Sequence, residues 1–127
     1  MRNSMRLKTT LSLMLITAAL LSTACRKKYG SSCEDSPKSL QLISEQSFKV
    51  ECKPFCAEKP GRVQGTGTYT IDSSICRSAL HAGVINDGDG GVVKVKILPG
   101  QAKYEGGMRN GIESFASGPS EHSFEIK

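Results

Sequence analysis

The chain has 127 residues and a mass of 13.6 kDa, the size of one ordinary domain, and its Gly, Pro and charged-residue contents exclude a collagen-like or disordered protein. Only 38% of the residues are hydrophobic, 6% are aromatic and Trp is absent, so the core must be small and covalent cross-links are expected. Of 17 Lys and Arg residues, six precede residue 29. The rest of the chain holds the other 11 basic residues and all 12 acidic residues, so its net charge is −1. This charge argues against a nucleic-acid partner.

The N-terminus has the pattern of a secretory signal peptide. A basic start from Met1 to Lys8 precedes an apolar run from Leu11 to Leu21 and three small residues. Eleven helical residues rise only about 16 Å, whereas a membrane span needs roughly 20 residues. We therefore predict a signal peptide over residues 1–24 and exclude it from the fold.

Cys25 follows this segment directly. The run Leu21-Ser-Thr-Ala-Cys25 resembles the lipobox of bacterial lipoproteins, in which the cysteine is diacylated and becomes the new N-terminus. The preferred Leu would stand where Ser22 is, and residues 22–24 also satisfy the small-x-small rule of ordinary signal peptidase. We predict a bacterial-type exported lipoprotein anchored to a membrane through lipid on Cys25 and facing the periplasm or cell surface. Plain secretion is the alternative.

The remaining chain is predicted to consist of a polar tether over residues 25–39 and a domain over residues 40–127, with a disulfide framework that starts at Cys33. Alternating apolar and polar residues, with turn residues between them, predict short strands. These lie at 48–52, 63–71, 93–97, 102–104 and 112–115, with a last strand in which Phe124 and Ile126 face inward. Turns or loops are predicted around Pro54–Gly61, at 86–91, at Pro99-Gly100 and at 106–111.

One helix is predicted, over about residues 73–83. Asp72-Ser73-Ser74 is typical of a helix N-terminus, and apolar residues then recur at helical spacing through Ile75, Cys76, Ala79 and Leu80. A short helix with so broad an apolar face is expected to be central. The fold class is therefore α+β.

Without Cys25, four cysteines remain, and an exported protein is expected to oxidise them to disulfides. Four cysteines allow three pairings, of which one with a Cys52–Cys56 bridge would restrain little. A zinc site would instead recruit Cys52, Cys56, His81 and His122. Their spacing matches no common zinc pattern, and no metal or other cofactor is predicted.

Several motifs together resemble the LCCL domain family, which includes cochlin and clotting factor C. The matching runs are Val63-Gln-Gly-Thr-Gly-Thr-Tyr69, Asp72-Ser-Ser-Ile-Cys76, His81-Ala-Gly-Val-Ile85, Gly90-Gly-Val-Val93, Pro99-Gly-Gln101, Tyr104 and Asn110-Gly-Ile-Glu-Ser114. The resemblance implies one central helix wrapped by two small β-sheets. It also implies two disulfide bridges, Cys33–Cys52 and Cys56–Cys76.

No catalytic constellation is evident, and the chain is predicted not to be an enzyme. Cys76 and His81 stand about 140° apart around a helix, so they do not face each other. The resemblance implies a non-catalytic extracytoplasmic module that binds an envelope or extracellular glycan, lipopolysaccharide or protein. The candidate binding residues, on the helix and neighbouring loops, are His81, Lys103, Arg109 and Asn110. The alternative is a structural or assembly protein of the cell envelope with no soluble ligand.

Overall fold

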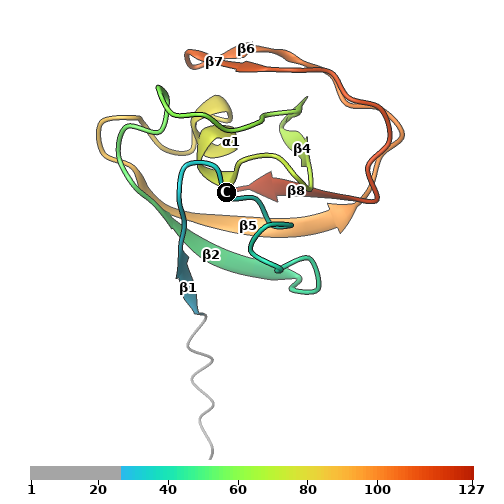
Figure 1. Ribbon diagram of the computed structural model, residues 1–127, viewed down its shortest axis with the longest axis horizontal. Helices are drawn as coiled ribbons and strands as arrows, with labels where there is room; N and C mark the ends of the chain where they lie inside the picture. The colour runs from blue at the N-terminus through green and yellow to red at the C-terminus, as the bar shows by residue number, and fades with distance from the viewer. Residues whose placement is uncertain (1–26) are drawn as a thin grey trace, which may run out of the picture.

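The computed structural model describes residues 27–127. A six-stranded sheet contains, in spatial order, β1 (Lys28–Gly30), β2 (Ser47–Cys52), β5 (Gly91–Pro99), β8 (His122–Ile126), β4 (Thr68–Thr70) and β3 (Gly65–Thr66). A two-stranded sheet contains β6 (Gly107–Arg109) and β7 (Ile112–Ser114). The helix α1 (Ile75–His81) lies between the two sheets (Figure 1). The predicted α+β class, with one helix, two sheets and two disulfides, is confirmed.

The core lies between α1 and the large sheet. The antiparallel strands β2 and β5 pair Phe48 with Val95 and Val50 with Val93, and all four side chains are buried. Lysines alternate with these residues and are exposed. In α1, Ile75, Cys76, Ala79 and Leu80 are buried, as their spacing predicts. The strong alternation and the helical spacing therefore identify β2, β5 and α1 correctly.

Three predicted segments differ in the structure. Residues 63–71 do not form one strand, because the chain reverses at Gly67 (φ +76°) and separates β3 from its antiparallel partner β4. Residues 106–111 are not a loop throughout: β6 and β7 form a hairpin whose two-residue turn is Asn110-Gly111. Both turn residues have positive φ, 51° and 75°, as a type I′ turn requires. Around 102–104 only Tyr104 pairs, in a bridge to Ser117.

The polar segment predicted to be a tether belongs largely to the fold. β1 pairs in parallel with β2. The backbone carbonyl of Asp35 accepts a hydrogen bond from the Ile75 amide at 2.9 Å, so this segment satisfies a free donor at the start of α1. Ser31 and Ser36 are buried. The segment packs because its polar groups find internal partners, which composition alone does not reveal. The predicted signal peptide, Cys25 and residue 26 lie outside the described residues.

The disulfide pairing implied by the resemblance is wrong. The bridges are Cys33–Cys56 and Cys52–Cys76, so the two closed loops overlap along the chain. The alternation of β2 places Cys52 on the same buried face as Val50, which looks toward α1, and Cys76 lies on the buried face of α1. Cys56 comes after the strand has ended and meets Cys33 instead.

Candidate functional site

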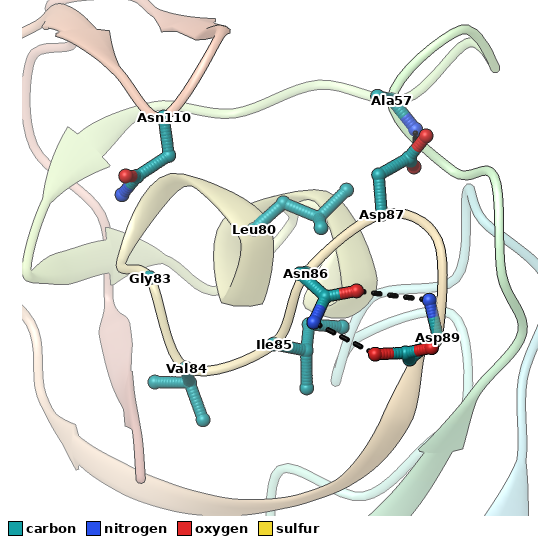
Figure 2. A pocket seen from close by; sticks show the side chains of 10 residues that line it. Ala57, Leu80, Gly83, Val84, Ile85, Asn86, Asp87, Asp89 and Asn110 are labelled. Carbon is teal, nitrogen blue, oxygen red and sulfur yellow. Dashed lines mark hydrogen bonds between the residues drawn. The ribbon is translucent and has the colours of Figure 1, made fainter.

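A pocket of about 560 Å³ opens at the C-terminal end of α1. Figure 2 shows Leu80 between Asn110 on one side and Ala57 with Asp87 on the other. Val84 and Ile85, which follow the helix, also line it, and the Val84 residue is 38% exposed. The pocket lining therefore combines apolar residues with amide and carboxylate groups.

The wall formed by the end of α1 has a defined backbone geometry. Gly83 adopts a positive φ of 75°, its amide donates to the Leu80 carbonyl, and the Val84 amide donates to the Ala79 carbonyl. These two bonds form a Schellman motif, which ends the helix and satisfies its last carbonyl groups. The chain leaves α1 in a fixed direction, so Val84 and Ile85 reach the pocket on a rigid support.

The opposite wall is the tight turn predicted at residues 86–91. The Asn86 side chain accepts from the Asp89 amide and donates to its carboxylate, both at 2.9 Å (Figure 2). Asp87 ties this turn to the loop after β2, because its carboxylate accepts from the Ala57 amide and its carbonyl accepts from the Phe55 amide, both at 2.8 Å. Two carboxylates, those of Asp87 and Asp89, therefore line the pocket.

Asn110 joins the β6–β7 hairpin to α1. Its side-chain amide donates to the His81 carbonyl at 2.9 Å, and its backbone occupies the left-handed region. Asn is one of the few residues other than Gly that adopt this region readily. Asn110 therefore lines the pocket and also fixes the position of the turn that forms one of its sides.

Substituting Asn110 is expected to separate these two structural contributions. Asn110→Ala should lower the free energy of unfolding by about 2 kcal/mol. It removes a hydrogen bond and places an alanine at positive φ, where its backbone is strained. Asn110→Gly keeps the turn and loses only the hydrogen bond, so it should cost about 1 kcal/mol. Urea denaturation of both variants measures the difference, and equal losses would argue against the turn contribution.

His81 is completely buried and uses both ring nitrogens. Nε2 lies 2.9 Å from the Gly107 carbonyl, which can only accept, so Nε2 carries the hydrogen. In that tautomer Nδ1 accepts from the Tyr69 hydroxyl, also at 2.9 Å. The side chain thus links β4, α1 and β6. His81, a candidate binding residue, is therefore inaccessible to a ligand and holds parts of the fold together.

The other two candidate residues are exposed. Arg109 is the last residue of β6, directly before Asn110, whereas Lys103 lies in a separate loop and pairs with Glu105 at 3.6 Å. Of the four candidates, only Asn110 lines the pocket. Sequence reasoning missed Leu80, Val84, Ile85 and Asp87. The adjacent apolar residues Val84 and Ile85, directly before a polar turn, were the available signal.

A second pocket of about 460 Å³ has a more polar lining, and two of its charged groups pair with each other. Arg62 and Asp72, which line it, form an ion pair at 2.8 Å. Burial raises the pKa of the Asp72 carboxyl, but the hydrogen bond from Thr70 and the charge and hydrogen bond of Arg62 outweigh it, so the pKa lies below its usual value. Outside this pocket, burial raises the pKa of Tyr69, partly opposed by a backbone hydrogen bond at Gly67 and by the charge of Arg109. The first pocket is therefore the stronger candidate site.

The described cysteines and the serines at the start of α1, Ser73 and Ser74, make structural contacts. All four cysteines in the described part of the chain form disulfides, including the two in the zinc alternative. Ser74 caps α1 by accepting from the Arg77 amide, and Ser73 accepts from the Gln64 amide. Within residues 27–127, no group of three or more His, Cys, Asp or Glu side chains is arranged to hold a metal ion.

The LCCL domain family model matches residues 23–124. The chain belongs to the LCCL domain family. Its LCCL domain is 38% identical over 74 residues to mouse vitrin and 38% identical over 73 residues to human cysteine-rich secretory protein LCCL domain-containing 2. It is also 39% identical over 72 residues to human cochlin.

These matches cover 55–58% of this chain but only 11–15% of each relative. The LCCL domain is thus one part of much longer proteins, and the similarity concerns the domain rather than those whole proteins. In the part of the chain that the structure describes, no helix is both long and apolar enough to cross a membrane.

Proposed function

We propose that this LCCL domain is a non-catalytic extracytoplasmic binding module whose ligand occupies the pocket at the end of α1. The observation that carries the proposal is a pocket of about 560 Å³ built on a rigid frame. Ligand sites are typically concave, largely pre-formed and lined by apolar groups with a few polar ones. The Schellman motif and the Asp87 and Asn110 hydrogen bonds support such pre-organisation.

The chemistry of the pocket narrows the ligand class. Leu80, Val84 and Ile85 offer apolar contact, whereas Asp87 and Asp89 offer hydrogen-bond acceptors and negative charge. These groups suit the hydroxyl groups of a glycan, or a basic side chain of a protein. They disfavour the phosphate groups of lipopolysaccharide at this position. A glycan or protein ligand is therefore favoured over lipopolysaccharide.

A glycan and lipopolysaccharide array, with a parallel capture of envelope or extracellular proteins, tests this proposal. Val84→Tyr should fill the pocket and lower the affinity at least about tenfold, because a ligand excluded from it loses more than 1.4 kcal/mol. The matched control is Val92→Tyr, since Val92 is similarly exposed (50%) but lies on β5 outside the pocket. Arg109→Ala tests the basic residue beside Asn110. Equal binding by both tyrosine variants would exclude this pocket as the site.

A structural or assembly role is the second candidate, and one surface favours it. Met108 and Phe115 are 65% and 56% exposed. Met108 pairs with Glu113, two residues before Phe115, so both apolar side chains stand on the outer face of the β6–β7 hairpin. Exposed apolar groups of this kind suit a contact with another protein. If the array and the capture detect no ligand, this role is favoured instead.

Lipid anchoring is the third part of the proposal. We expect the mature chain to begin at Cys25 and to partition into detergent, because two or three acyl chains contribute about 0.8 kcal/mol per buried CH₂. Cys25→Ser should release the protein into the soluble fraction. Mass spectrometry of the mature N-terminus gives the answer directly. An unmodified terminus would contradict lipid anchoring, and a free terminus at Cys25 would instead favour secretion by ordinary signal peptidase.

A further inference from the structure

One face of the large sheet carries a cluster of lysines. In the strand register, Lys28 stands opposite Lys49, and Lys49 stands opposite Lys94. The Lys94 backbone pairs in turn with Lys127, through two hydrogen bonds of 2.9 Å. Opposed residues of neighbouring strands point to the same face. These four residues, together with Lys96 on β5, form what we call the lysine face.

The lysine face points away from the core. Its residues on β2 and β5 alternate with the buried Phe48, Val50, Val93 and Val95, and Figure 1 shows α1 on one side of these strands. The lysines therefore occupy the other side. The face is a broad surface spanning neighbouring strands, which lie about 4.8 Å apart.

Most of this positive charge is not neutralised. Lys28 pairs with Glu51 at 2.7 Å and lowers the pKa of that carboxyl, and Lys127 lies 3.9 Å from Glu125. Glu125 stands opposite Lys96 in the register, but among residues 27–127 no carboxylate lies within ion-pairing distance of Lys49, Lys94 or Lys96. Like charges placed directly opposite each other destabilise a sheet. The opposed lysines thus weaken the fold slightly, and their unpaired positive charge suits an anionic partner.

The position of the lysine face relative to the N-terminus indicates which anionic partner it binds. β1 is the edge strand of the sheet, and Lys28 is only three residues after Cys25. Three residues span at most about 11 Å, close to the Debye length of about 8 Å at physiological salt. An acylated Cys25 would therefore hold the start of β1 near the lipid headgroups. A broad basic surface that spans several strands also suits a plane of headgroups better than a single polymer strand.

We propose that the lysine face docks on an anionic phospholipid bilayer. The proposed position of the domain at the membrane rests on the lipid anchoring proposed above. The lysine face adds the orientation of the domain relative to the membrane. The large sheet lies against the membrane, and α1 with its pocket faces away from it. Each lysine near an anionic surface contributes roughly a fivefold increase in partitioning.

The test uses the exported chain with Cys25→Ser, so that acyl chains do not mask the effect. Binding to vesicles of phosphatidylcholine with one-third phosphatidylglycerol is compared with binding to pure phosphatidylcholine. Lys49→Gln/Lys94→Gln should weaken binding to the anionic vesicles roughly 30-fold. The matched control is Lys38→Gln/Lys59→Gln, which removes the same charge from exposed lysines outside the sheet. It should change binding by less than about threefold, since only long-range attraction is lost.

Three further measurements make the result decisive. The Lys49/Lys94 variant should melt no lower than the wild type, because it relieves a like-charge pair, so unfolding does not explain a loss of binding. Equal effects of the two double variants, or no preference for anionic vesicles, would overturn the proposal. So would binding of a soluble polyanion such as heparin through the same lysines without vesicle binding. The state of Cys25, measured by mass spectrometry, remains a separate result.

Discussion

Cys76→Ser is expected to lower the free energy of unfolding by about 2–5 kcal/mol, a large share of the roughly 5–15 kcal/mol of a typical domain. The Cys52–Cys76 bridge spans 24 residues, and in the chain-entropy model a loop of that length contributes about 3.5 kcal/mol. Both cysteines are buried, so the bridge also fastens α1 to the inner face of β2. The loss should appear as a lower denaturation midpoint and rapid proteolysis.

A double variant, Cys52→Ala/Cys76→Ala, controls for mispairing of the free Cys52 thiol. It should lose similar stability while the Cys33–Cys56 bridge remains intact. Peptide mapping of the exported wild type under non-reducing conditions checks the connectivity itself. A linked Cys33–Cys52 or Cys52–Cys56 peptide, or free thiols at these positions, would contradict the structure.

The cysteine pairing shows what the sequence could and could not provide. The alternation of β2 already places Cys52 with Phe48 and Val50, and the spacing of α1 places Cys76 with Ala79 and Leu80. Both cysteines were therefore predictable as core residues. Their partnership was not, because it depends on how α1 crosses the sheet. That arrangement is set by contacts between segments far apart in sequence.

Elements with strong periodicity were predicted well, whereas short hairpins were not. β5 has a long alternating pattern, and both its existence and its buried face follow from that pattern. β3 and β4 are only two and three residues long, and their separation depends on the backbone conformation of Gly67. In the segment before β2, a polar composition suggested a tether. Buried Ser31 and Ser36 are tolerated there because their polar atoms have hydrogen-bond partners.

The candidate site was only partly predictable for a similar reason. Ala57, Leu80, Asp87 and Asn110 come from four separate segments, and the folded chain alone brings them together. His81 and Arg109 were predicted as binding residues because their side chains can carry charge and form hydrogen bonds. The pocket is instead lined by apolar groups and by Asn110, whose side-chain amide donates a hydrogen bond to the last carbonyl group of α1, at His81. Residue type alone therefore indicated the neighbourhood of the pocket but not the residues that line it.

His81→Ala is expected to lower the free energy of unfolding by about 3–5 kcal/mol. The substitution opens a cavity at a fully buried position and removes the hydrogen bonds of His81 with the Tyr69 hydroxyl and the Gly107 carbonyl. Since His81 connects β4 and β6 to α1, we expect the amides of the β6–β7 hairpin to exchange faster with solvent. Hydrogen exchange and urea denaturation together measure both effects.

Tyr69→Phe is the matched control, because it removes one hydroxyl group from this network and keeps the aromatic ring packed against Phe124. It should cost about 1–2 kcal/mol, since His81 Nδ1 then lacks a partner. In the double variant the two losses should not add, because they share one hydrogen bond. If His81 instead served mainly to contact a ligand, His81→Ala would reduce ligand binding and leave the denaturation midpoint and hairpin exchange unchanged. A buried imidazole with both nitrogens bonded inside the protein predicts the opposite result.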